Sequence, residues 1–327
     1  MSLVTLPIDD FIPGILEKLN QHQNLIVSAS PGAGKTTRLP PELLNLTDKK
    51  VLVLEPRRIA ASASADRIAT ERGWSLGQEV GFQVRFESRV GTETRLIFLT
   101  EALLGRKLLT DPTLKDVGVV VLDEFHERSV HVDLALGLLK ELQELERPDL
   151  KIVVMSATLD TTSLENYLPD SFIAEIPGKI FPLETQLQKT GQLLQTNSQF
   201  IENVCEQVRK ASSSLSVGHH CLVFLPGVGE IERCRERLED FCSGQNLVLY
   251  PLHGSLTLDE QRQVLKANSQ SKIILTTNIA ESSLTIDGVD TVIDSGLVRQ
   301  QRLDAKTGFS KLDLVRISKA SAIQRAG

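Results

Sequence analysis

The sequence predicts an α/β protein of two tandem domains, each a mainly parallel sheet flanked by helices. Three observations lead to this fold class. The chain has 327 residues, which fits two domains of about 160 residues each. Short apolar runs rich in β-branched residues alternate with longer segments of helical spacing, as in βαβ units. This alternation pauses once, around Pro177-Gly178 and Phe181-Pro182, and then resumes, so we expect an interdomain linker there.

The predicted strands are runs of four to seven mainly apolar residues, which is typical of strands buried on both faces of a parallel sheet. Between them, the apolar residues of Ala60–Glu71 and Val132–Leu145 recur at helical spacing, as Leu134, Leu138, Leu142 and Leu145 illustrate. In the first half the predicted strands are Leu25–Ser28, Val51–Glu55, Leu96–Thr100, Val117–Asp123 and Ile152–Ser156. In the second half they are Cys221–Leu225, Leu247–Tyr250, Lys272–Thr276 and Thr291–Asp294.

Composition narrows the class of protein. Hydrophobic residues make up 41% and charged residues 24%, as in globular domains and unlike disordered chains. No apolar run approaches the roughly 18 residues of a membrane-spanning helix. The first ten residues carry two acids and no basic residue, unlike a secretory signal. We therefore expect a cytoplasmic protein without a membrane segment. The formal net charge is −6, so any surface that binds nucleic acid must be local.

The four cysteines, Cys205, Cys221, Cys234 and Cys242, form no C-x-x-C pair and have no histidine at zinc-ligand spacing. We expect buried or half-buried reduced thiols. His219-His220 beside Cys221 leaves a metal site open as an alternative to a solvated loop that enters a strand.

A phosphate-binding loop follows the first predicted strand. Ala29–Thr37 matches G-x-x-x-x-G-K-[ST] with Ala29 in the first glycine position. Glycines in such a loop turn backbone N–H groups toward phosphate oxygens, and the next helix adds its positive end. A chance glycine-rich turn is disfavoured because strand, loop and helix occur in the required order. The predicted nucleotide contacts are Gly32, Ala33, Gly34, Lys35, Thr36 and Thr37.

An acidic pair ends another apolar strand about 90 residues after this loop. Asp123 and Glu124 follow Val117–Leu122, at the strand end where parallel sheets bind ligands. Asp123 with the Thr36 hydroxyl would hold Mg²⁺, and Lys35 would reach the β and γ phosphates. Glu124 would orient and deprotonate the attacking water. Without the phosphate loop, such a pair would more often be a solvated helix start.

Asp123–Ser129 (DEFHERS) resembles the DEAH-type motif of superfamily 2 RNA helicases. Further motifs of that family occur in order along nearly the whole chain, from about Asn24 to Gly327. The segments DEFHERS, LEPRR and RLDAKTG resemble the bacterial HrpB branch in particular. The other matching segments are Leu54–Ala61, Gly81–Phe86, Thr100-Glu101, Ser156–Thr158, Leu222–Gly227, His253–Leu256, Thr277–Gly288 and Gln324–Gly327.

The resemblance implies two RecA-like domains, 1–178 and 179–327, with ATP between them. It makes His126 a catalytic residue that links the nucleotide to Ser156 and Thr158, which couple the ATP state to the second domain. Arg67 matches an arginine that packs on adenine, although a solvated helix charge is the alternative. The aromatic residue often opposite is Leu265 here, so we expect loose base selectivity. Thr285 and Asp287 match residues that approach the ribose.

The resemblance also implies that RNA crosses both domains and is held by its backbone, which carries no sequence information. The matching residues are Arg57, Arg58, Thr100, Ser255, Thr277 and Asn278. Single-stranded DNA stays possible unless a 2′-OH is contacted. Val298–Arg316 resembles a β-hairpin that these proteins insert into the nucleic-acid path, with an ordinary surface hairpin as the alternative.

The final motif of the family is Q-R-x-G-R-x-G-R, of which this sequence holds Gln324 to Gly327. Gln324 is a predicted catalytic residue, while the two later arginines, which neutralise charge on the transferring phosphoryl group, are absent. We therefore expect a fragment that binds nucleotide but hydrolyses it poorly. The expected activity of the whole protein, taken to be a monomer, is ATP-driven 3′ to 5′ RNA unwinding. Two alternatives remain: an RNA-stimulated clamp or ribonucleoprotein remodeller, and a P-loop protein with no nucleic-acid role.

Overall fold

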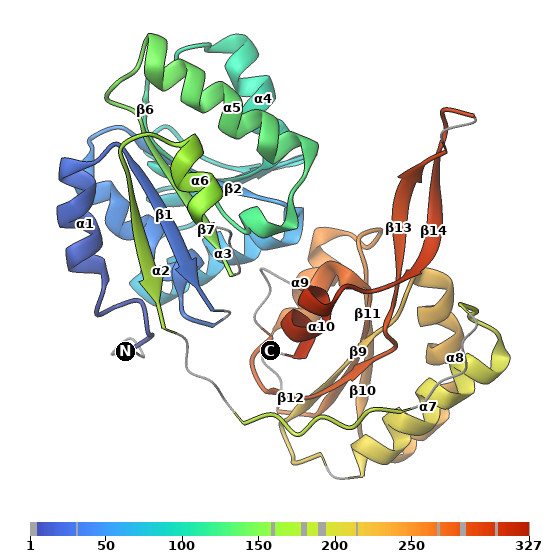
Figure 1. The fold of residues 1–327 in the computed structure, drawn as a ribbon. Coiled ribbons are helices and arrows are strands. Elements are labelled where there is room, and N and C mark those ends of the chain that lie inside the picture. The colour runs from blue at the N-terminus through green and yellow to red at the C-terminus, as the bar shows by residue number, and fades with distance from the viewer. Residues whose placement is uncertain are drawn as a thin grey trace. The chain divides into compact units, whose positions relative to one another are not determined.

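The computed structural model describes residues 5–30, 32–157, 161–177, 182–188, 194–213, 215–266, 269–281, 286–304 and 307–326. The chain divides into two compact units, Met1–Phe181 and Pro182–Gly327. Each contains a mainly parallel sheet flanked by helices (Figure 1). The predicted fold class is therefore confirmed.

Unit 1 alternates strands and helices along the chain. Its helices are α1 (Ile12–Gln21), α2 (Lys35–Leu43), α3 (Arg58–Arg72), α4 (Glu101–Thr110), α5 (Val130–Leu145), α6 (Thr161–Tyr167) and the 3₁₀ turns η1 (Leu44–Leu46) and η2 (Phe125–Glu127). Its strands are β1 (Asn24–Ala29), β2 (Lys50–Glu55), β3 (Val80–Val84), β4 (Glu87–Arg89), β5 (Leu96–Thr100), β6 (Val117–Leu122), β7 (Lys151–Ser156) and β8 (Ser171–Ile176).

The sheet of unit 1 has the strand order β4-β3-β5-β2-β6-β7-β1-β8. All neighbours pair in parallel except β3 with β4, which is antiparallel. The central strands are buried along almost their whole length, because α4, α5 and α6 cover one face and α2 and α3 pack on the other. All five predicted strands are present, whereas β3, β4 and β8 had not been predicted.

Helix α5 shows how the core is arranged differently from the leucine repeat in the sequence. Ser129 caps the helix by accepting a hydrogen bond from the backbone N–H of Val132 at 3.0 Å, as N-cap serines do. The buried side chains include Val132, Leu136 and Leu139. Leu134 and Leu145 are instead 55% and 73% exposed. The helical spacing was thus a correct indicator of secondary structure but not of the packed face.

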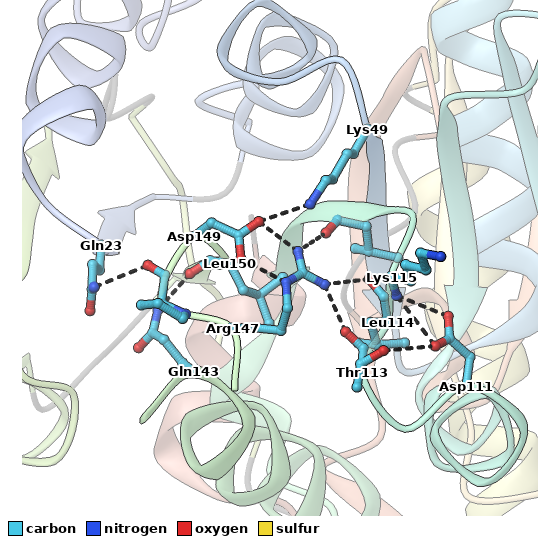
Figure 2. A network of polar contacts seen from close by, with 12 residues as sticks. Gln23, Lys49, Asp111, Thr113, Leu114, Lys115, Gln143, Arg147, Asp149 and Leu150 are labelled. Carbon is cyan, nitrogen blue, oxygen red and sulfur yellow. Dashed lines mark hydrogen bonds and ion pairs between the residues drawn. The ribbon is translucent and has the colours of Figure 1, made fainter. Parts of the chain in front are cut away.

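Buried Arg147 connects two loops at the edge of the sheet where β6 and β7 begin (Figure 2). The guanidinium of Arg147 donates to the carbonyl oxygens of Thr113, Leu114 and Val117 at 2.7–2.8 Å. It also contacts both carboxylate oxygens of Asp149, at 2.6 and 2.8 Å. Arg147 therefore joins the loop before β6 to the loop before β7.

Unit 2 repeats the alternation in a smaller sheet with the order β10-β11-β9-β12, parallel throughout. Its helices are α7 (Ser198–Ser212), α8 (Val228–Gly244), α9 (Leu258–Leu265), α10 (Lys319–Ala326) and the 3₁₀ turn η3 (Asn278–Ala280). Its strands are β9 (His220–Phe224), β10 (Val248–Leu252), β11 (Lys272–Thr276), β12 (Val289–Asp294), β13 (Leu297–Leu303) and β14 (Ser310–Arg316). Each of the four predicted strands of this half is present.

Strands β13 and β14 form a separate antiparallel hairpin that extends away from the sheet of unit 2 (Figure 1). The pairing runs in register from Leu297 opposite Arg316 to Leu303 opposite Ser310. Leu303, Phe309 and Leu312 are 63–77% exposed. The hairpin expected over Val298–Arg316 is therefore present, with large apolar side chains exposed to solvent.

Candidate functional site

The phosphate-binding loop lies between β1 and α2, at the carboxyl edge of the unit 1 sheet. Gly34 has φ +89°, and a Cβ built there would come within 2.7 Å of the Leu6 side chain. Only glycine satisfies both conditions without strain. Lys35 and Thr36 then begin α2, so their side chains and the first backbone N–H groups of the helix lie at the end of the loop.

Strand β6 brings its acidic residues to the same edge. Thr36 Oγ1 donates to Asp123 Oδ2 at 2.5 Å. Lys35 Nζ lies 3.2 Å from Glu124 Oε1. The two predicted halves of the nucleotide site are therefore in direct contact, although nearly 90 residues separate them in the sequence.

The backbone around the acidic pair is held in an unusual conformation. The N–H of Asp123 donates to the carbonyl of Leu54 on β2 at 3.0 Å. Asp123 Oδ1 accepts from the N–H of Glu124 at 2.8 Å, and Glu124 itself has φ +49°. A positive φ is uncommon for a residue with a side chain and concentrates at functional positions.

Burial and like charge together raise the pKa of the Asp123 and Glu55 carboxylates. Burial first, and then the charge of Glu124, raise the pKa of Asp123 to about 7. Burial opposes the charge on Lys35, but Glu124 and Asp123 outweigh it and raise the lysine pKa. Burial, followed by the charges of Asp123 and Glu124, raises the pKa of Glu55 well above its usual value. An added cation would relieve this repulsion.

The oxygen atoms at this edge fit a magnesium ion that is held jointly with phosphates. The Thr36 hydroxyl and Asp123 carboxylate are already in contact, and Mg²⁺ favours oxygen ligands while keeping several waters or phosphates. Both oxygens of Glu55 and Oε2 of Glu124 are buried and form no hydrogen bond with any residue that the structure describes. Within the described ranges no group of three or more His, Cys, Asp or Glu forms a protein-only metal site.

His126 connects the acidic segment to the end of β7. Its Nδ1 lies 3.2 Å from Ser156 Oγ and accepts the N–H of Ala157 at 3.4 Å. The same nitrogen is 3.4 Å from Glu124 Oε2. The structure therefore brings His126 and Ser156 together, as the resemblance implied, while Thr158 lies outside the described residues.

Strands β2, β5 and β3 carry further candidate residues to this edge. Arg57 and Arg58 follow β2, and Thr100 ends β5. Arg57 forms an ion pair with Glu127 at 2.9 Å. Sequence reasoning assigned no contact to Arg85 or Phe86, which follow β3. There the Arg85 guanidinium lies 4.6 Å from the centre of the Phe86 ring, and Phe86 is 87% exposed.

Arg67 lies on the exposed side of α3. Its Nε is 2.5 Å from Glu71 Oε1, and 47% of its side chain is exposed. Burial therefore does not block the contact with adenine that the resemblance implied, and this contact remains a prediction.

The candidates in unit 2 lie at loops of its own sheet. His253 Nδ1 is 2.9 Å from Ser255 Oγ, just before the capping box of α9 that Thr257 and Glu260 form. Thr277 and Asn278 follow β11, and Leu265 is the last residue of α9. Asp287 is exposed in the turn before β12, whereas Thr285 lies outside the described residues.

The final motif is built around a residue to which sequence reasoning gave no role. Gln324 is half-buried on α10. The adjacent Arg325 is 4% exposed and contacts Glu281 Oε2 at 2.8 Å and Asp294 Oδ1 at 2.9 Å. Its guanidinium also lies 4.7 Å from the Phe224 ring centre. Nothing local in the sequence marks Arg325 as buried, because the acids that pair with it, Asp294 and Glu281, lie 31 and 44 residues away.

The four cysteines and His220 are buried in unit 2, whereas His219 is exposed. All four cysteines are free and buried, which confirms the predicted thiols. His219 pairs with Asp290 at 2.9 Å, while buried His220 accepts the N–H of Lys272 at 3.4 Å. Neither histidine belongs to a metal-binding group in the part of the chain described above. No helix in those residues is both long and apolar enough to cross a lipid bilayer.

Comparisons with known proteins agree with this geometry. Residues 10–167 match the DEAD/DEAH box helicase family, and residues 200–327 match the helicase conserved C-terminal domain. The chain is 41% identical to the ATP-dependent RNA helicase HrpB of Escherichia coli over 99% of its length, which is 40% of that protein. It is 36% identical to the ATP-dependent RNA helicase HrpA of Borreliella burgdorferi over its whole length, again 40% of the relative.

Solved structures give the same result. The crystal structure of the Escherichia coli DEAH/RHA helicase HrpB superposes with a TM-score of 0.88 at 40% identity, covering 99% of this chain and 41% of that one. A second HrpB crystal structure, described as a DExH-box NTPase, gives a TM-score of 0.79. The chain thus spans about two-fifths of the length of these relatives.

Proposed function

Because this chain belongs to the DEAD/DEAH box helicases, we propose that it binds ATP with Mg²⁺ and forms the motor of an RNA helicase that moves 3′ to 5′. The observation that carries the proposal is the contact between the phosphate-binding loop and the acidic strand end. Thr36 touches Asp123 and Lys35 touches Glu124, so one triphosphate placed on the loop would reach all four side chains.

Each of these side chains would have a separate task in hydrolysis. Lys35 would neutralise the β and γ phosphates, and the Thr36 and Asp123 oxygens would hold Mg²⁺, which neutralises charge on the transferring phosphoryl group. Glu124 would accept a proton from the attacking water as the bond from the γ-phosphorus to the β-γ bridging oxygen breaks. Its Oε2, which lies 3.4 Å from His126 Nδ1, would accept that hydrogen bond.

RNA would follow the other half of the same sheet edge. In a parallel sheet all strand ends lie on one edge, and the order β3-β5-β2-β6-β7-β1 places Arg85, Thr100 and Arg57 on one side. The nucleotide-site residues that follow β6 and β1 lie on the other side. Arginine and short polar groups suit phosphate contacts that carry no sequence preference. In unit 2, Ser255, Thr277 and Asn278 would continue these contacts, and Thr285 and Asp287 would approach the ribose.

The hairpin β13–β14 favours strand separation over a clamp. It extends from the sheet and exposes Leu303, Phe309 and Leu312, which would unstack bases rather than bind phosphates. A clamp or remodeller needs no such element. Strand displacement on a duplex with a 3′ overhang tests this choice directly.

The proposed function is tested by measuring ATP hydrolysis with and without single-stranded RNA, with single-stranded DNA as the comparison. We expect RNA to stimulate hydrolysis about tenfold or more, and DNA to do so less. Lys35→Ala should abolish hydrolysis, while Lys49→Ala, an exposed lysine paired with Asp149, should not. ATP turnover that is indifferent to RNA would leave a P-loop protein without a nucleic-acid role.

A further inference from the structure

Glu230 is a buried carboxylate that joins three separate segments of unit 2. It lies in the first turn of α8, and its side chain is only 3% exposed. Its Oε1 accepts hydrogen bonds from Thr196 Oγ1 at 2.7 Å and from Arg299 Nη2 at 3.0 Å. Arg233, one turn further along α8, contacts the same oxygen at 3.0 Å.

The first of these segments is the coil that leads into α7. Thr196 lies in this coil, just before the helix. It is held twice, because Arg233 Nη1 also donates to the carbonyl of Thr196 at 2.7 Å. The coil is thus held on α8 through Glu230 and Arg233.

The second segment is the base of the hairpin. Arg299 is the third residue of β13 and pairs with Leu314 of β14. Its side chain passes over Gly227, where an added Cβ would come within 2.9 Å of Arg299 Nε and 3.1 Å of Glu230 Oε2. Gly227 is in an extended conformation that any residue adopts, so its missing side chain matters here because it leaves room for this arginine.

Hydrogen bonds and charges around Glu230 hold the three segments together. Burial alone would raise the pKa of Glu230, but the hydrogen bonds from Thr196 and Arg299 and the positive charge of Arg299 lower it. A buried carboxylate that loses a hydrogen-bond donor bears the desolvation cost of the unmade bond, and one that loses its arginine partners is left with uncompensated charge. The three segments are therefore expected to move together rather than separately.

We propose that Glu230 is a positioning residue that couples the coil before α7 to the β13–β14 hairpin. A pull on Thr196 shifts the Glu230 carboxylate, and Arg299 carries this shift to the base of the hairpin. The consequence for strand separation rests on the proposed helicase function, whereas the mechanical coupling does not.

The coupling is tested by hydrogen–deuterium exchange of the hairpin amides in the 327-residue chain. Thr196→Val removes only the hydroxyl donor, and among the described residues the side chain of Thr196 reaches the hairpin only through Glu230 and Arg233. We expect it to speed exchange at the β13 base by at least about threefold, and to have no further effect in a Glu230→Gln background. The matched control is Arg235→Gln on α8, whose partner is Glu232.

Two results would overturn the proposal. One is that the hairpin amides exchange at the same rate in Thr196→Val and in Arg235→Gln. The other is an unchanged effect of Thr196→Val when Glu230 is already glutamine. If Glu230→Gln does not fold, as loss of α8 protection at Ile231–Leu238 would show, Arg299→Gln replaces it in the same double-variant comparison.

A second measurement concerns function and separates the two proposals. In the protein that unwinds RNA, Glu230→Gln should lower the amount of strand displacement per ATP hydrolysed at least about threefold. The rate of RNA-stimulated ATP hydrolysis should stay within about twofold of the parent. A parallel fall of both rates would assign Glu230 a merely structural role. If the parent itself shows no RNA response, the proposed function fails, while the exchange experiment still decides the coupling.

Discussion

The guanidinium of Arg325 on α10 donates to the carboxylate of Glu281, which follows η3, at 2.8 Å. Ser321, one turn earlier on α10, donates a hydrogen bond to the other oxygen of Glu281. This link fastens the helix that carries Gln324 to the segment that carries Thr277 and Asn278. The predicted ATP-contacting and RNA-contacting parts of unit 2 are therefore joined through one buried ion pair.

Removing the charge of Arg325 should destabilise unit 2. Arg325→Met removes a buried guanidinium that pairs with half-buried Glu281 and exposed Asp294, and we expect a loss of about 2 kcal/mol in the free energy of unfolding, as for lost hydrogen bonds to charged groups. Urea denaturation followed by the fluorescence of a probe in unit 2 measures it. Arg235→Met, which breaks an exposed pair on α8, should cost less than about 1 kcal/mol. Equal losses in the two variants would contradict the role given to Arg325.

Arg147→Met should destabilise unit 1 by about 2–3 kcal/mol, because three backbone carbonyls lose a charged donor. The pH dependence should change as well. Hydrogen bonds from Arg147 hold the pKa of Asp149 below its usual range, so this carboxylate stabilises the fold above about pH 4 and stops doing so as the pH falls further. The difference in unfolding free energy between parent and variant should therefore shrink in acid. A difference that stays constant down to pH 2 would argue against this ion pair.

Asp123→Asn should stabilise the nucleotide-free chain at alkaline pH. Because the pKa of Asp123 is raised to about 7, its protonated form is favoured in the folded state, and the fold loses stability as the pH rises through that value. We expect a melting temperature about 3 °C above that of the parent at pH 8.5, and no gain at pH 5. Asp116→Asn, at an exposed position, serves as the control. A gain that is the same at both pH values would rule out this explanation.

His126→Ala should leave ATP binding nearly unchanged but weaken the stimulation of ATP hydrolysis by RNA. His126 contacts Ser156 and Ala157 at the end of β7, while Lys35 and Thr36 bond to Glu124 and Asp123, so the affinity for ATP should change less than about threefold. Stimulation of hydrolysis by RNA should fall about tenfold or more. Ser156→Ala should show a smaller loss of the same kind. Loss of ATP binding in His126→Ala would mean that the histidine supports the nucleotide site itself.

The nucleotide site could be predicted from the sequence because its parts are local patterns. The loop around Gly34 and the acidic end of β6 each follow a buried strand, and parallel strands deliver their ends to one edge. The contact of Thr36 with Asp123 then follows from the topology. Two positions, Thr158 and Thr285, lie outside the described residues, and their roles stay predictions.

Other features depend on contacts between residues far apart in the chain, which no local pattern contains. Arg147 and Glu230 resemble ordinary helix-surface charges in the sequence, yet both are buried by partners more than 30 residues away. Leu134 and Leu145 follow helical spacing but point to solvent, because the neighbouring Val132 and Leu139 pack on the sheet. Strand β8 was missed because its pattern is only half-buried at the sheet edge.

The central claim is that one chain binds ATP and RNA and that each changes the affinity for the other. The most direct test measures the dissociation constant of a short single-stranded RNA for Glu124→Gln, which should hold ATP without hydrolysing it, with and without Mg²⁺ and ATP. The account predicts a shift of about tenfold or more, matched by an equal shift in ATP affinity when RNA is added, because such coupling is reciprocal. RNA affinity that is the same with and without ATP would contradict it.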